Sequence, residues 1–226
     1  MKKWDELPDS IRLEEVRPYY EELQKHRISL CIKRIFDFVF SIILILLLSP
    51  VFLILMPLIG LTSAGGVFFC QTRVTTYGKT FRIFKFRTMI DGAEQIGSQV
   101  TTNADARVTK VGRFLRKVRL DELPQLFNIV KGEMSFVGTR PEVEKYVKYY
   151  RNEMMATLLL PAGVTSQASI VYKDEERLLA SGEDADSTYI NVVLPEKMKY
   201  NLEYVKRFSF WTDIKLIIKT IGAVLS

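Results

Sequence analysis

Apolar residues are concentrated in one part of this chain. From Phe38 to Leu61 the sequence runs for 24 residues without a charged side chain. A straight helix of that length would measure ~36 Å at ~1.5 Å per residue, while the hydrocarbon core of a bilayer is ~30 Å thick. The segment is therefore long enough to cross a membrane, and a wholly buried core helix of this length is not expected.

Ser49-Pro50 lies in the middle of the apolar segment. Proline removes a helix hydrogen bond and bends the helix at that point. The two flanks are equally basic, whereas a spanning helix is oriented by unequal basic flanks. We therefore expect a re-entrant helix that enters and leaves on the cytosolic side, with Ser49 and Pro50 deepest. A proline-kinked transmembrane helix is the alternative.

Shorter patterns follow the apolar segment. Alternating apolar residues predict strands over 67–74 and 79–89 around a turn at Tyr77-Gly78, and a third strand over 134–137. Helical spacing predicts helices over 106–119, 121–131, 141–157 and 174–181, with loops at 91–104 and 182–188 and a break at Pro161-Ala162-Gly163.

A last helical pattern extends over residues 195–224, where apolar side chains recur at the spacing of one helix face. Lysines such as Lys199 and Lys215 alternate there with aromatic residues such as Trp211. This mixture is typical of a helix lying in a membrane interface. An amphipathic helix packed on the protein core would show the same spacing, so both interpretations stay open.

These patterns divide the chain into three parts. Residues 1–30 predict a peripheral arm, 31–62 the re-entrant membrane helix, and 63–226 a cytosolic domain that ends in an interfacial helix. The predicted fold class is α+β and mostly helical, in a small membrane-associated domain with a re-entrant, Ser-Pro broken membrane helix and interfacial amphipathic helices.

Composition limits the kinds of partner and of catalytic group that we expect. The 226 residues carry a net charge of +6, which favours an anionic partner such as nucleic acid, lipid headgroups or a phosphorylated substrate. With two cysteines, Cys31 and Cys70, and one histidine, a disulfide framework and a Cys/His zinc site are not expected. Acid–base chemistry would fall mainly to carboxylates, lysine or tyrosine.

A basic run precedes two adjacent carboxylates, Asp121 and Glu122. Cations this close repel one another and need an anion, either these carboxylates or a bound phosphate. A solvated basic helix that faces lipid headgroups is the alternative. The run consists of Lys110, Arg113, Arg116, Lys117 and Arg119.

Asp121-Glu122-Leu123-Pro124 also has the pattern of a helix start, because acidic residues and proline suit the first turn. A carboxylate placed there beside cations and a divalent metal ion can attack phosphorus. Arg140 precedes Pro141, which keeps it extended, and its guanidinium group matches phosphate oxygens. The sequence has no glycine-rich phosphate loop of the Walker or dinucleotide-binding kind.

The chain contains the stretches KRIFDF, the central Ser-Pro, VFFCQTRV, KFRTM, VGRFLRKVRLDELPQLFNIVKGEMSFVGTRP and FWTDIKLIIKT. Together they resemble the bacterial sugar transferase family, the monotopic phosphoglycosyl transferases that initiate polysaccharide or glycoprotein glycan assembly. The resemblance covers residues 31–223, and the length is similar to the minimal catalytic form, without the extra transmembrane domain of larger members. DELPQLxNxxKGxMSxVGxRP is too long and particular to arise by chance.

The resemblance implies a ping-pong reaction with Mg²⁺. Asp121 would be both nucleophile and magnesium ligand, attacking the β-phosphate of a UDP-sugar and releasing UMP. Polyprenyl phosphate, as undecaprenyl phosphate, would then attack the phosphosugar on Asp121 to give a polyprenyl diphosphate-sugar. Glu122 completes the catalytic dyad.

The resemblance also implies a phosphate-binding pocket. Arg116 and Arg140, with Pro141, match positions that hold substrate phosphate, and Lys85 and Arg87 of KFRTM would line the same pocket. A water-soluble donor and a lipid acceptor must meet at the membrane interface. The implied location is the bacterial inner membrane, with residues 63–226 as a catalytic domain on its cytosolic face.

Some points stay open at this stage. Residues 166–179 depart from the family pattern in a region thought to bear on sugar choice, so the sugar and the pathway are not predicted. A homodimer stays open, although nothing in the sequence supports it, and nucleic-acid binding is not expected because the aromatics lie on membrane-like helices. The rival functions are a non-catalytic basic membrane adaptor and a metal-dependent nucleotide-sugar hydrolase.

Overall fold

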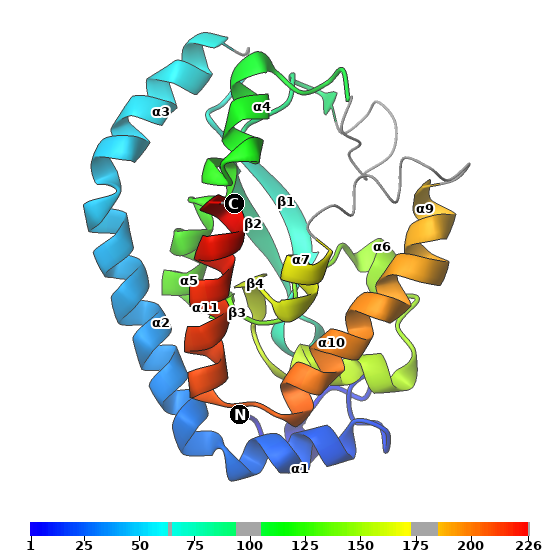
Figure 1. Ribbon diagram of the computed structural model, residues 1–226. Coiled ribbons are helices and arrows are strands. Elements are labelled where there is room, and N and C mark those ends of the chain that lie inside the picture. The colour runs from blue at the N-terminus through cyan, green and yellow to red at the C-terminus, as the bar shows by residue number, and fades with distance from the viewer. Residues whose placement is uncertain (63–64, 94–104, 173–184, 226) are drawn as a thin grey trace.

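A computed structural model describes residues 1–62, 65–93, 105–172 and 185–225. The fold is α+β and mostly helical, as predicted, with one antiparallel and one parallel pair of strands (Figure 1). The α-helices are α1 Arg17–Lys25, α2 Arg27–Leu47, α3 Ser49–Thr62, α4 Lys110–Lys117, α5 Gln125–Lys131, α6 Glu144–Val147, α7 Gln167–Val171, α9 Ala185–Thr188, α10 Leu194–Lys206 and α11 Phe210–Leu225. The strands are β1 Phe68–Val74, β2 Thr80–Phe86, β3 Met134–Val137 and β4 Ala162–Thr165. The 3₁₀ turns are η1 Trp4–Glu6, η2 Thr76–Gly78, η4 Leu120–Glu122 and η5 Asn152–Leu159, and η6 Tyr189–Val193 is a π-helix.

The predicted hairpin is confirmed. β1 pairs with β2 in antiparallel register, with Phe68 opposite Phe86 and Val74 opposite Thr80. The turn between them contains two consecutive residues with positive φ, Tyr77 at 59° and Gly78 at 72°. Glycine adopts this backbone conformation without steric cost, which explains why the chain turns here. The hairpin carries Lys85 and Arg87 to the end of the molecule where α4 begins.

The apolar segment forms two helices, α2 and α3, bent by 63° at the predicted Ser49-Pro50 position. Pro50 has no N–H to offer the carbonyl of Leu46, and the Ser49 hydroxyl donates to that carbonyl at 2.8 Å instead. Serine therefore compensates for the donor that proline removes. Among the described residues no single helix is long and apolar enough to cross a membrane, whereas this bent pair passes the same test of length and composition.

Residues 1–25, within the segment predicted to be a peripheral arm, pack against the main body. Their apolar side chains share a buried cluster with residues from η5 and α10, far along the chain. The members from the first segment are Leu7, Ile11, Val16, Tyr20 and Leu23. Because Ile11, Val16 and Leu23 are fully buried, this segment is held by hydrophobic contacts to the rest of the fold.

Several predicted helix boundaries are wrong. The pattern over 195–224 forms two helices, α10 and α11, separated at residues 207–209, and Phe208 turns into the core at the break. The predicted helix 141–157 is a short α6 followed by the 3₁₀ segment η5. The helix predicted over 106–119 begins only at Lys110, because the Thr109 side chain accepts a hydrogen bond from Gly112 N and caps it.

The remaining differences lie between residues 121 and 188. The predicted helix 121–131 is the 3₁₀ turn η4 followed by α5, which begins only at Gln125. The predicted break at Pro161-Ala162-Gly163 contains the start of strand β4, which pairs in parallel with β3 and, at four residues, is too short to give a strand pattern. The predicted loop 182–188 ends in helix α9. The expected helix 174–181, and most of the expected loop 91–104, lie outside the described residues.

Candidate active site

Asp121 and Glu122 lie on η4, a single 3₁₀ turn between α4 and α5. The turn is entered through Arg119, which has a left-handed backbone with φ of 57°. A non-glycine residue in this region costs about 1 kcal/mol, and such conformations persist where the surrounding structure holds them. This reversal ends α4 and allows η4 to pack against β2, so that the dyad meets the side chain of Lys85.

Glu122 is clamped between two cations. Its Oε1 atom accepts hydrogen bonds from Lys85 Nζ at 3.0 Å and from Arg140 Nη2 at 2.7 Å. Burial alone would raise the pKa of Glu122, but the charges of Arg140 and Lys85 outweigh burial and hold that pKa well below its usual value. Glu122 therefore favours the carboxylate form and fixes two cations beside Asp121.

Asp121 is also buried, but its carboxylate is less fully hydrogen-bonded than that of Glu122. Within the part of the chain that the structure describes, its Oδ1 atom has no hydrogen-bond partner. Burial and the adjacent charge of Glu122 raise the pKa of Asp121, while Lys85, Arg116 and Arg119 oppose that rise. A buried carboxylate oxygen without a partner, in a cationic surrounding, is suited to attack an electrophile or to bind a metal ion.

Arg116 reaches the site from α4. Its Nε donates to the hydroxyl of Thr88 at 2.9 Å, just after β2, which orients the guanidinium group. Helix and strand approach closely because residue 112 is glycine, since an added Cβ there would lie 2.0 Å from the Thr88 carbonyl oxygen. The other cations of α4, Lys110, Arg113 and Lys117, are exposed. Thus only part of the basic run faces the carboxylates.

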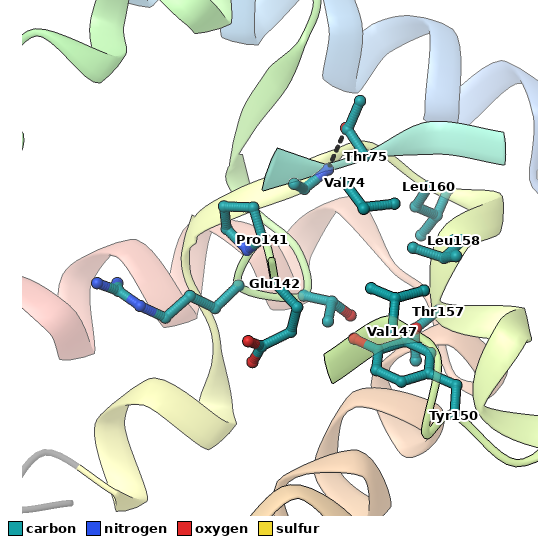
Figure 2. A pocket seen from close by; sticks show the side chains of 12 residues that line it. Val74, Thr75, Pro141, Glu142, Val147, Tyr150, Thr157, Leu158 and Leu160 are labelled. Atoms are coloured by element: carbon teal, nitrogen blue, oxygen red, sulfur yellow. Dashed lines mark hydrogen bonds between the residues drawn. The ribbon is translucent and has the colours of Figure 1, made fainter. Parts of the chain in front are cut away.

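Arg140 and Pro141 extend from the loop after β3. The carbonyl of Pro141 accepts a hydrogen bond from Arg73 at 3.3 Å, and the next residue, Glu142, accepts one from the hydroxyl of Tyr189. Figure 2 shows Pro141 and Glu142 on one side of a pocket, with Val147, Tyr150 and Thr157 facing them. This buried network holds the loop from behind, so Arg140 can extend towards Glu122.

The structure does not place every predicted residue beside the dyad. Arg87 forms an ion pair with Asp91 at 3.3 Å and lies against Gly65. Its role in substrate binding stays a prediction. Ser49 and Pro50 lie at the exposed bend of α2 and α3, and none of the interactions described for them involves the dyad.

Sequence reasoning missed three residues of the site. Arg119 was counted in the basic run but not as part of the site, although its charge acts on both carboxylates. No motif or spacing in the sequence marked Thr88 as a site residue. Gln125 lies four residues after Asp121 and is 2% exposed, and the helical spacing of the two polar residues could have indicated it.

A magnesium ion would find few protein ligands here. Among the described residues no group of three or more His, Cys, Asp or Glu side chains could hold a metal ion. Mg²⁺ commonly uses one or two carboxylates, completed by water and substrate phosphates. The unpartnered Oδ1 of Asp121 fits that pattern, because it offers one carboxylate oxygen among the cations Lys85, Arg116 and Arg119.

The profile of the bacterial sugar transferase family matches residues 28–226. The chain belongs to this family. Among curated relatives, the UDP-N-acetylgalactosamine-undecaprenyl-phosphate N-acetylgalactosaminephosphotransferase of Aeromonas hydrophila is 39% identical over 198 residues, 86% of this chain. The UDP-glucose:undecaprenyl-phosphate glucose-1-phosphate transferase of Escherichia coli (strain K12) is 35% identical over 195 residues, 84% of this chain.

These sugar transferases are longer than the chain, which spans 44% of the Aeromonas protein and 39% of the E. coli protein. A relative of similar length is the exopolysaccharide production protein ExoY of Rhizobium meliloti (strain 1021). It is 35% identical over 207 residues, which cover 85% of this chain and 84% of that relative.

Proposed function

We propose that this bacterial sugar transferase moves a sugar 1-phosphate from a UDP-sugar to polyprenyl phosphate, with Asp121 as the covalent nucleophile. The observation that carries the proposal is the buried Asp121, whose unpartnered Oδ1 lies beside a Glu122 already neutralised by Lys85 and Arg140. The names of the relatives support both substrate classes.

In the first step, an oxygen of Asp121 attacks the β-phosphorus of the donor. The bond from that phosphorus to the oxygen bridging it to the α-phosphate breaks, and UMP leaves with the bridging oxygen. Arg116, Arg119 and Lys85 offset the negative charge that gathers on the phosphoryl oxygens. Magnesium, when bound through Asp121 and the substrate phosphates, would neutralise further charge on the diphosphate.

In the second step, a phosphate oxygen of polyprenyl phosphate attacks the phosphorus linked to Asp121. The aspartyl–phosphorus bond breaks, so the carboxylate is restored and a polyprenyl diphosphate-sugar forms. Glu122 has a strongly lowered pKa and holds Lys85 and Arg140 in place throughout. We assign it the positioning of these cations for both phosphates.

The lipid acceptor requires the site to lie at a membrane surface. We propose that α2 and α3 form a re-entrant helix in the bacterial cytoplasmic membrane, with the catalytic domain on the cytosolic side. Leu46, Leu47 and Leu53 near the bend are each about 70% exposed, which suits lipid contact better than water. On α4, the exposed Lys110, Arg113 and Lys117 share a helix face that suits anionic headgroups.

The decisive test is the mass of the intact protein after exposure to UDP-sugars and Mg²⁺. UDP-N-acetylgalactosamine and UDP-glucose are the first donors to try, given the relatives' names. The protein should gain the mass of one phosphosugar and release about one UMP per chain, and Asp121→Asn should do neither. Addition of undecaprenyl phosphate should then restore continuous UMP release.

The rival functions give different results. A hydrolase would release UMP continuously without the lipid acceptor. A membrane adaptor would release none, and Asp121→Asn would leave its lipid binding unchanged. Absence of an adduct with every UDP-sugar of a broad panel would refute the covalent mechanism.

A further inference from the structure

Gln125 is a buried polar residue whose amide nitrogen is left unpaired among the described residues. It opens α5, is 2% exposed, and its Nε2 atom has no hydrogen-bond partner among the described residues. A buried amide donor without a partner destabilises the folded protein, and such atoms are rare in native structures. A ligand that accepts a hydrogen bond from Nε2 would remove this cost.

A second unpartnered atom lies one helical turn away. Asp121 Oδ1 is likewise buried without a partner, and only Arg73 Nε shares this property among the described side chains. Leu123 and Pro124 between them have helical backbone angles, so η4 continues into α5 as one helical run. Side chains three or four residues apart along an α-helix are neighbours, with Cβ atoms about 5–6 Å apart, and η4 and α5 bring Asp121 and Gln125 to this spacing along the chain.

The two atoms are chemically complementary but are not bonded to each other. An amide N–H can donate to a carboxylate oxygen, yet both atoms stay without a partner in the described fold. A group whose central atom bonds to the Asp121 carboxylate, and whose oxygens surround that atom, would occupy Oδ1 and give Gln125 Nε2 an acceptor. A phosphoryl group has this form, because its oxygens surround the phosphorus that Asp121 attacks.

We infer that Gln125 is a substrate-binding residue whose Nε2–H donates to a phosphoryl oxygen of the phosphosugar at Asp121. The inference rests on the proposed covalent mechanism. It adds an uncharged hydrogen-bond donor to the cationic residues that contact phosphate in that mechanism. Lys85 and Arg140 already donate to Glu122, whereas Gln125 Nε2 has no competing acceptor in the described fold. The donor is therefore preorganised for the phosphoryl group.

Gln125→Met separates this function from a structural role. Methionine has a similar volume and no polar group, so it removes the unpartnered donor, and the melting temperature should stay equal or rise. Single-turnover formation of the phosphosugar adduct should nevertheless slow by about 10- to 100-fold, as expected for a hydrogen bond to a charged group. Gln125→Glu, which keeps the shape but repels phosphate, should slow it at least as much.

Asn128 provides the matched control on the same helix. It is also a buried side-chain amide, but it is fully bonded, donating to the Arg82 carbonyl and to Glu133 and accepting from Phe84 N. Asn128→Leu should therefore lower the melting temperature clearly. Gln125→Met should not lower the melting temperature.

Two results would overturn the inference. One is adduct formation at the wild-type rate in both Gln125 variants. The other is a fall in melting temperature for Gln125→Met as large as that for Asn128→Leu, which would make the side chain a packing element. If the wild-type protein itself forms no adduct, the proposed function fails before Gln125 is tested, so the two failures are distinguishable.

Discussion

Lys33→Met tests how the bent helix pair is joined to the rest of the fold. Lys33 Nζ donates to Asp213 Oδ2 at 2.6 Å and to the Val137 carbonyl at 2.9 Å, and lies 4.0 Å from Asp37. All three charged side chains are at least 95% buried. One lysine on α2 therefore links α11 and β3 through a contact that water hardly screens.

Removing Lys33 leaves two buried carboxylates without a cation. Breaking a buried pair from one side costs about 3–5 kcal/mol. At about 2–4 °C per kcal/mol for a chain of this length, the melting temperature should fall by roughly 6–20 °C. Thermal unfolding of the detergent-solubilised protein measures this directly.

The loss should depend on pH in a defined direction. Burial already raises the pKa of Asp213, opposed by Lys33 and by the Tyr204 hydroxyl, so losing Lys33 raises that pKa further. A carboxyl whose pKa rises on folding weakens the folded state above its unfolded pKa, and the penalty disappears as pH falls through the folded pKa. The destabilisation should therefore be larger at about pH 8 than at about pH 5.

A double variant provides the control. Asp213→Asn keeps an acceptor for the Tyr204 hydroxyl and removes one buried charge, so Lys33→Met with Asp213→Asn should recover much of the stability lost at about pH 8. The reasoning fails if Lys33→Met lowers the melting temperature by less than about 2 °C, or lowers it equally at both pH values.

Three further predictions concern the site and the membrane. Arg116→Met should slow adduct formation by about 10- to 100-fold. Thr88→Val removes the hydrogen bond that orients Arg116 and should slow adduct formation less. Equal slowing in the two variants would contradict the assigned phosphate contact. Gly112→Ala should lower the melting temperature because its Cβ would lie 2.0 Å from the Thr88 carbonyl oxygen, whereas Gly222→Ala, with open space around it, should not. A membrane-impermeant thiol reagent should label Cys31 and Cys70 only in inverted vesicles, fastest at the exposed Cys31, and labelling of the two from opposite sides would exclude the re-entrant arrangement.

Local features of this protein could be read from its sequence, because they depend on neighbouring residues. Backbone chemistry at Ser49-Pro50 determined the bend, and alternation around Tyr77-Gly78 determined the hairpin. The adjacency of Asp121 and Glu122 and the family motif around them indicated the reaction class. Element boundaries were less accurate, since the last helical pattern is interrupted at residues 207–209, where Phe208 packs into the core.

Only the tertiary structure decided which charges meet. Lys33 pairs with Asp213 across 180 positions, and Glu122 joins Lys85 and Arg140 from two different strand ends. It also decided that one face of α4 points to the dyad, and that Asp121 and Gln125 are left unpartnered. These outcomes depend on burial and on contacts between distant segments, which periodicity and motif spacing do not encode.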